Sequence, residues 1–200
     1  ILERAQEMTR MEKALLDIKD GNIVRKTDNR VLMSLGELAT EALYSLTHSE
    51  HLTAESTYQI KSNAYSFGCC FAEVEVDIPL CKVTVLDIIN VHDCGKLINP
   101  QLATAQVHGG MCMAIGYALS EQLLYDEKTG KPLNNNLLDY KLSTTMDHPH
   151  LEAEFVENYE PTSAFGTKAL GEPPAVPGAP AIRNALLNAT GVSANKLPLN

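Results

Sequence analysis

A glutamate beside two prolines is the residue whose type and position best suit acid–base chemistry. Glu172 stands in the run Gly171-Glu172-Pro173-Pro174, flanked by the apolar residues Leu170, Ala175 and Val176. Each proline fixes its own φ and disfavours helical backbone at the residue before it, so we expect an extended, firmly held Glu172. Apolar packing would raise the pKa of its carboxyl group toward the range of a general base. On composition alone, a surface glutamate at a helix entrance is the simpler interpretation.

Small residues are concentrated in one long apolar segment. The spacing predicts a helix over residues 102–124, with short side chains in its middle: Ala103, Ala105, Gly109, Gly110, Ala114 and Gly116. Because glycine costs about 1 kcal/mol relative to alanine in a helix interior, we expect another segment to approach this backbone closely. We expect a close approach at Gly171 as well, since a residue without Cβ lets another chain or a cofactor come near.

The cations nearest to the motif in sequence are Lys168 and Arg183. Arg183 falls in the first turn of a helix expected over residues 180–190, where it faces either a cofactor or a carboxylate. A structural role is the simpler interpretation for both cations. His92 and His108 match no metal-ligand spacing, so we expect them to pack or to form hydrogen bonds.

The cysteines indicate neither a disulfide framework nor a zinc site. There are five, an odd number without a CxxC pair: Cys69, Cys70, Cys81, Cys94 and Cys112. Because a free cysteine behaves as a small apolar residue, we expect buried, reduced thiols in a cytoplasmic protein. No protein ligands for a metal are predicted.

The beginning of the chain predicts a helix followed by a hairpin. Apolar residues recur at helical spacing: Leu2, Ala5, Met8 and Met11. Residues 16–19 and 22–25 then flank Asp20-Gly21, a dipeptide typical of tight hairpin turns. Ser34 and Glu37 have the spacing of a capping box, which predicts that a second helix begins next and runs to about residue 45.

The remainder of the chain predicts a sheet and further helices. Alternating residues indicate two or three strands between residues 64 and 91, and turn formers predict a loop over residues 90–100. A strand is expected at 152–157, and Gly191 is expected to stop the last helix. The elements give an α+β fold. The length allows one large domain or two small ones, and we expect one folded unit.

The charge excludes one class of partner. With 25 acidic and 16 basic residues, the net charge is −9, which argues against a general nucleic-acid binder. No stretch approaches the roughly 20 apolar residues that cross a bilayer, and we expect no membrane association. The first residues lack a Met and already lie inside the opening helix, so we expect the chain to be a fragment of a longer protein.

Five motifs stand in the order in which one enzyme family has them. They are YSFGxxFxEVxVD at residues 65–77, DxGxxxNP at 93–100, QVxGG at 106–110 with His108 as its variable residue, DYK at 139–141 and Gly-Glu-Pro-Pro at 171–174. With them the chain resembles the xanthine oxidase family of molybdenum hydroxylases over nearly its whole length. The sequence around these motifs is most similar to the molybdenum-binding subunits of bacterial xanthine dehydrogenases.

The resemblance implies a role for two residues, beside the role that Gly171 has from its missing Cβ. In the family, the glutamate of the Gly-Glu-Pro-Pro motif is the base that activates a molybdenum-bound hydroxide, and the matching residue is Glu172. The glutamine of the QVxGG helix hydrogen-bonds the cofactor, and the matching residue is Gln106. A neutral amide suits a pterin edge because it both donates and accepts, although a helix glutamine satisfied by backbone groups is the alternative. Gly171 completes the expected cofactor-binding residues.

The resemblance also implies the cofactors, partners and reaction. The fold would be a mixed sheet with packed helices, the C-terminal portion of a molybdopterin-binding domain, with residues 1–200 as a fragment that lacks the upstream half. The molybdenum–pterin cofactor, expected as molybdopterin cytosine dinucleotide, is held without protein metal ligands. Electrons would leave through 2Fe-2S clusters and FAD on partner subunits of a cytoplasmic complex. Hypoxanthine and xanthine would be oxidised to urate, with hydride passing to the Mo=S group.

Two alternatives stay open beside purine oxidation. The same scaffold could oxidise an aldehyde or another N-heterocycle, because the family's substrate-pocket residues lie outside these 200. The chain could also be a truncated, noncatalytic assembly fragment. In either case we do not expect this chain alone to turn over substrate.

Overall fold

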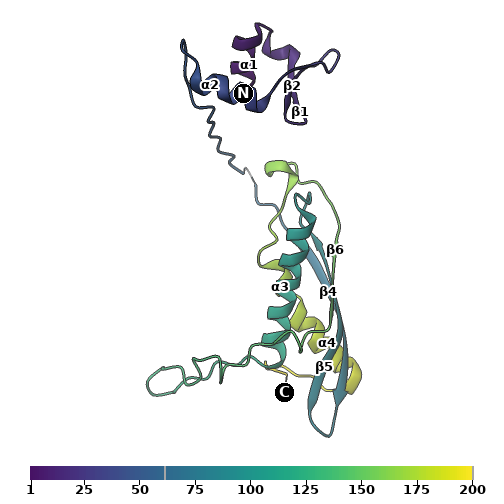
Figure 1. Cartoon of the computed structure of the whole chain (residues 1–200). Helices are drawn as coiled ribbons and strands as arrows, with labels where there is room; N and C mark the ends of the chain where they lie inside the picture. The colour runs from purple at the N-terminus through teal and green to yellow at the C-terminus, as the bar shows by residue number, and fades with distance from the viewer. Residues whose placement is uncertain (61, 200) are drawn as a thin grey trace. The chain divides into compact units, whose positions relative to one another are not determined.

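A computed structural model describes residues 1–60 and 62–199, and the chain divides into two compact units, Ile1–Thr57 and Tyr58–Asn200 (Figure 1). This differs from the expectation of one folded unit. The physical reason is that the chain forms two hydrophobic clusters with no residue in common. Each cluster gives its own unit the apolar burial that a core requires.

The first unit is a small three-stranded antiparallel sheet with two helices. Its core contains the fully buried Ala5, Leu16, Ile23 and Leu38. In chain order the elements are α1 (Leu2–Thr9), a 3-10 turn (Lys13–Leu15), β1 (Leu16–Lys19), β2 (Asn22–Arg25), β3 (Val31–Ser34) and α2 (Leu35–Tyr44).

Local sequence signals account for most of this unit. The predicted hairpin is confirmed, and Asp20 and Gly21 both have positive φ (47° and 73°), as the tight turn requires. The capping box at the start of α2 is confirmed in both directions, since the Ser34 hydroxyl accepts from Glu37 N and the Glu37 carboxylate accepts from Ser34 N. Helix α1 is shorter than expected, because Arg10 takes a left-handed conformation that ends it.

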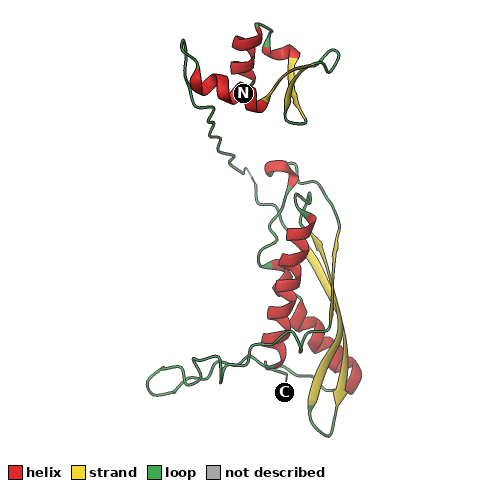
Figure 2. Ribbon diagram, viewed as in Figure 1, coloured by secondary structure: helices red, strands yellow, loops and turns green. Residues whose placement is uncertain are grey.

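The second unit is built on a mixed sheet of three strands. Strand β5 (Lys82–Asp93) is central, with β4 (Phe67–Asp77) antiparallel on one side and β6 (His150–Phe155) parallel on the other. Two helices, α3 (Pro100–Leu119) and α4 (Gly178–Thr190), pack on this sheet (Figure 2). The α+β architecture with a mixed sheet is therefore confirmed.

The core of this unit lies between the sheet and the two helices. Side chains from both layers and from the C-terminal segment are buried there: Val85, Ile88, Val107, Met111, Ile115, Ala118, Ala179, Ile182 and Leu199. Burial alternates along the end of β5, where Ile88, Asn90 and His92 are buried and the residues between them are only half-buried. One face of β5 is thus directed toward the helices.

Several element boundaries differ from the sequence prediction. The loop expected to start at Asn90 starts later, because β5 continues to Asp93 with both neighbouring strands paired to it. Helix α3 begins at Pro100, where the Asn99 side chain caps it by accepting from Leu102 N, and it ends at Leu119 instead of residue 124. Gly191 ends α4 with φ 73°, as predicted.

Short turns complete the second unit. Residues Ala164–Gly166 and Pro173–Ala175 form 3-10 turns, and an isolated bridge between Tyr125 and Pro132 closes a hairpin near residue 128. Across residues 1–60 and 62–199, no helix has the length and apolarity needed to span a bilayer.

Candidate functional site

Helix α3 is in very close contact with the Gly-Glu-Pro-Pro segment. A Cβ added at Gly110 would lie 2.5 Å from Pro174 Cβ and 2.8 Å from the carbonyl carbon of the same proline. A Cβ at Gly178, on the first turn of α4, would collide with Ala114. The prediction that another segment approaches the small-residue backbone is confirmed, and the 3-10 turn and α4 are the segments that do so.

Three side chains from β5 and α3 hold this segment by its carbonyl groups. They are Gln106 Nε2 to Gly171 O (2.9 Å), Asn90 Nδ2 to Pro174 O (2.9 Å) and Tyr117 Oη to Ala175 O (2.6 Å). Burial raises the pKa of the Tyr117 phenol, which keeps it protonated as a donor. The backbone around Glu172 is therefore fixed on both sides of the carboxylate.

Sequence reasoning missed two of these anchoring residues. Asparagine is a turn former, which favours a loop at Asn90, yet Asn90 is fully buried on β5. The period-two alternation through Ile88, Asn90 and His92 is the signal that would have placed it in the strand. No sequence signal indicated that the Tyr117 hydroxyl would reach Ala175.

The backbone of Glu172 differs from the prediction. Glu172 has φ −85° and ψ −34°, which is helical and not extended. The reason is local: Glu172 precedes a 3-10 turn in which its carbonyl oxygen accepts from Ala175 N at 3.0 Å. This hydrogen bond outweighs the bias that Pro173 imposes on the preceding residue.

The surroundings of Glu172 also differ from the prediction. Leu170 and Val176 do not desolvate it as expected, because Leu170 packs against the core and Val176 is 66% exposed. Glu172 is itself exposed in this structure. The apolar environment inferred from neighbours in sequence is therefore not formed by the residues that the structure describes.

The predicted site residues Gln106, Gly171 and Glu172 do come together. Gln106 donates to the carbonyl group of the residue that precedes Glu172, although the two segments are far apart in sequence. A Cβ added at Gly171 or at Gly109 would meet no atom within 4 Å, so the surface beside them is open. The alternative interpretation of Gln106, a helix glutamine that bonds a backbone group, is confirmed by this hydrogen bond. The Gln106 side chain is nevertheless exposed.

A second pair of segments positions the chain just before this site. The DxGxxxNP loop pairs with residues 166–168 through Lys168 N to Cys94 O (2.7 Å) and Lys96 N to Gly166 O (2.8 Å). Gly95 has φ 73°, and a Cβ there would clash with the Gly166 carbonyl oxygen. Lys168 Nζ lies 2.7 Å from Asp93 Oδ2, which confirms a structural role for Lys168.

The remaining candidates have structural surroundings. Arg183 donates to Ala194 O (3.0 Å) and to Ser193 Oγ (2.8 Å), so it holds the C-terminal loop and its structural role is confirmed. His92 is 1% exposed and lies against Gly68, whose missing Cβ makes room for the ring, so the expectation that His92 packs is confirmed. Burial lowers the pKa of His92.

The cysteines only partly follow the prediction. All five are free, but Cys94 alone is buried, while Cys69 and Cys81 are exposed. Burial raises the pKa of the Cys70 thiol to about 11. Strand β4 exposes Cys69 because alternate side chains point away from the core, and Cys81 lies in the β4–β5 turn.

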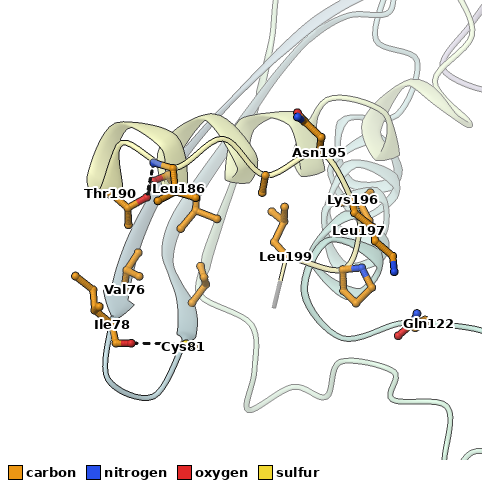
Figure 3. Close-up of a pocket in the computed structure, with 14 residues that line it drawn as sticks. Val76, Ile78, Cys81, Gln122, Leu186, Thr190, Asn195, Lys196, Leu197 and Leu199 are labelled. Atoms are coloured by element: carbon orange, nitrogen blue, oxygen red, sulfur yellow. Dashed lines mark hydrogen bonds between the residues drawn. The ribbon is translucent and has the colours of Figure 1, made fainter.

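An apolar pocket of about 640 Å³ lies elsewhere in the second unit (Figure 3). Its walls come from the end of β4, α4 and the C-terminal segment, with Val76, Leu186 and Leu199 among the lining residues. None of the predicted site residues lines it. The candidate site is therefore the open surface around Gln106 and Glu172.

Comparison with known proteins decides the family. Residues 1–149 match the model of a molybdopterin cofactor-binding domain. The chain belongs to this family. It is also 49% identical over all 200 residues to the putative xanthine dehydrogenase molybdenum-binding subunit XdhA of Escherichia coli K12, of which it covers 27%. The resemblance inferred from the five motifs is thereby confirmed.

Solved structures of family relatives have the same fold. Quinoline 2-oxidoreductase from Pseudomonas putida 86 matches 99% of this chain with a TM-score of 0.83 and 27% identity. Reconstituted CO dehydrogenase from Oligotropha carboxidovorans matches 99% with a TM-score of 0.83 and 26% identity. The chain covers 26% and 25% of those two chains, about a quarter of their length.

The open surface fits the family's cofactor in its chemistry. A pterin edge presents donors and acceptors, and the exposed Gln106 amide can provide both. Gly109 and Gly171 leave room for a large planar group to approach. Among the described residues, no group of three His, Cys, Asp or Glu side chains could hold a metal ion.

Proposed function

We propose that this chain forms one wall of the cofactor site of a molybdenum hydroxylase that oxidises hypoxanthine and xanthine to urate. The observation that carries the proposal is the hydrogen bond from Gln106 to Gly171, because it brings the cofactor-binding and catalytic candidates to one open surface. Family membership supports the cofactor, and the 49% identity to XdhA supports the purine substrate.

Each of the three residues has a separate task in this proposal. Gln106 holds the edge of the pterin with its amide, and Gly171 lets the cofactor lie close to the backbone. Glu172 accepts a proton at a carboxylate oxygen during hydroxylation of the ring carbon. When bound, the molybdenum–pterin group supplies the oxidising centre. The hydrogen bonds to Gly171, Pro174 and Ala175 fix the backbone from which Glu172 reaches the substrate.

The proposal extends to partners and location. Since the chain spans about a quarter of its relatives, we propose that turnover needs the rest of the subunit and partner subunits that carry 2Fe-2S clusters and FAD. The cofactor form we propose is molybdopterin cytosine dinucleotide. We also propose a cytoplasmic location, because free and exposed thiols such as Cys69 and Cys81 fit a reducing compartment.

A substrate panel tests the proposed reaction. The assembled enzyme is supplied with an artificial electron acceptor and with xanthine, hypoxanthine, quinoline or benzaldehyde, and kcat/KM is measured for each. We expect xanthine or hypoxanthine to exceed the other two by at least about tenfold, since a site built for polar purine groups rejects analogues that lack them. Urate should be the product that accumulates.

The other outcomes separate the alternatives. A preference for quinoline or benzaldehyde would contradict the purine substrate and leave the family unchanged. No turnover of any substrate, in an assembly that contains molybdenum, would favour a noncatalytic assembly fragment.

A further inference from the structure

Asp93 and Lys168 form a partly buried ion pair beside the proposed site. Lys168 Nζ lies 2.7 Å from Asp93 Oδ2, with 4% of the lysine side chain and 13% of the aspartate side chain exposed. The ammonium also lies 5.5 Å from the centre of the Phe67 ring. Two charges removed from water to this degree cost desolvation energy, which their mutual attraction has to offset.

Two further hydrogen bonds stabilise the Asp93 carboxylate of this pair. Asp93 also accepts from Gly95 N at 3.0 Å and from Asn158 Nδ2 at 3.3 Å. Burial by itself would raise the pKa of Asp93, but these hydrogen bonds and the one from Lys168 outweigh it and hold that pKa below its usual value. Asp93 is therefore charged at neutral pH.

Lys168 stands four residues before Glu172, and hydrogen bonds hold the chain at residues 168, 169 and 171. Lys168 N donates to Cys94 O at 2.7 Å, Ser66 Oγ donates to Ala169 O at 2.5 Å, and Gln106 holds Gly171. The ion pair is the only one of these anchors that depends on charge. It fixes the start of the short segment whose end carries the proposed base.

We propose that Asp93 and Lys168 are positioning residues for Glu172: their ion pair sets the path of residues 168–172 and so aims the carboxylate at the reacting atoms. This inference rests on the proposed function, because it assumes that Glu172 is the base. Neither side chain is placed in contact with substrate or cofactor. An exposed pair, Lys96 after β5 and Glu157 after β6, provides a matched comparison, since Lys96 Nζ and Glu157 Oε2 are 2.5 Å apart with 53% and 43% of the side chains exposed.

The test is a double-mutant cycle in the assembled enzyme with xanthine as substrate. Lys168→Met keeps most of the side-chain length and removes the charge, and it is combined with Glu172→Gln. We expect Lys168→Met alone to lower kcat by at least about tenfold while KM stays within about threefold, as for a misaligned catalytic group. In the Glu172→Gln background the same substitution should cause no further loss, because the residue through which it acts is already gone.

Hydrogen exchange gives a readout that does not depend on activity. In Lys168→Met, amides of residues 168–172 should exchange at least about fivefold faster, because the local opening of this segment becomes easier. Lys96→Met should leave kcat and this exchange within about twofold of wild type, as expected for an exposed pair.

Every other result contradicts the positioning role. Losses that multiply in the Glu172→Gln background, a change in KM alone, or unchanged exchange over residues 168–172 would each overturn it. If Lys168→Met does not assemble, Asp93→Asn replaces it in the same cycle, and failure of both to assemble would identify the pair as a folding element. Full activity of Glu172→Gln alone would instead refute the base, which separates failure of the proposed function from failure of this inference.

Discussion

Gln106 and Gly171 are 65 residues apart in sequence and are joined by a hydrogen bond of 2.9 Å from the glutamine amide to the glycine carbonyl group. The bond connects helix α3 to the residue just before Glu172. It gives the glutamine two tasks in the proposed site, because the same exposed amide that anchors the catalytic segment is available to a cofactor.

Loss of the Gln106 amide should weaken cofactor retention. Removing one hydrogen bond of about 1 kcal/mol corresponds to roughly fivefold weaker binding. We therefore expect Gln106→Ala in the assembled enzyme to lose molybdenum faster during repeated dilution and gel filtration, measured by metal analysis. Gln101→Ala, at an exposed position in the first turn of the same helix, should retain molybdenum like wild type. Equal retention by both variants would contradict the proposed role of Gln106.

Two adjacent glycines on α3 should respond in opposite directions to alanine. At Gly110 the new methyl group meets Pro174 and Ala175, so we expect Gly110→Ala to destabilise the protein by about 1–3 kcal/mol. At Gly109 there is no protein atom within 4 Å, and in the cofactor-free protein alanine should stabilise the helix by up to about 1 kcal/mol. Thermal unfolding of the protein prepared without cofactor checks both changes. A lower midpoint for Gly109→Ala than for Gly110→Ala would refute the close contact.

His92 should make stability depend on pH in the weakly acidic range. Burial lowers its pKa from the usual value of 6.5, so the unfolded chain binds a proton at a pH where the folded chain does not. Stability is then fully present above about pH 6.5 and falls as pH drops from there toward the lower folded pKa, by at most about 1.4 kcal/mol per pH unit.

Substitution of His92 provides the measurement. We expect the thermal midpoint of wild type to fall between pH 7.5 and pH 5.5, and the fall to be smaller in His92→Leu, which cannot titrate. His150→Leu removes a histidine whose side chain is 72% exposed and should leave the slope as in wild type. A slope that is the same in all three proteins would show that protonation of His92 does not control stability.

The sequence predicted most strongly those features that depend on neighbouring residues. The capping box of α2, the Asp20-Gly21 turn and the Gly191 stop are each determined within a few positions, and the structure confirms them. The contact of α3 with another segment was also predictable. Glycine destabilises a helix interior, and close packing of a neighbouring segment against it can offset that cost.

The errors concern features that depend on distant segments. The residue type of Asn90 favours a loop, but its side chain reaches Pro174 across the core. Glu172 was expected to be extended, whereas a 3-10 turn sets its backbone. Its solvent exposure depends on what packs against it, which is not determined by residue spacing. The parallel pairing of β5 with β6 requires a long crossover, so no local pattern indicates it.

The central claim is that Glu172 is the catalytic base. The most direct measurement is xanthine-dependent reduction of an artificial acceptor by the assembled enzyme, comparing wild type, Glu172→Gln and Glu127→Gln. Glutamine keeps the shape of the side chain and removes the base, and Glu127 is an exposed glutamate in a distant turn. We predict a loss of at least about 100-fold in kcat for Glu172→Gln, with unchanged molybdenum content and with Glu127→Gln like wild type. Activity of Glu172→Gln within a few fold of wild type would contradict the claim and make Glu172 a structural residue.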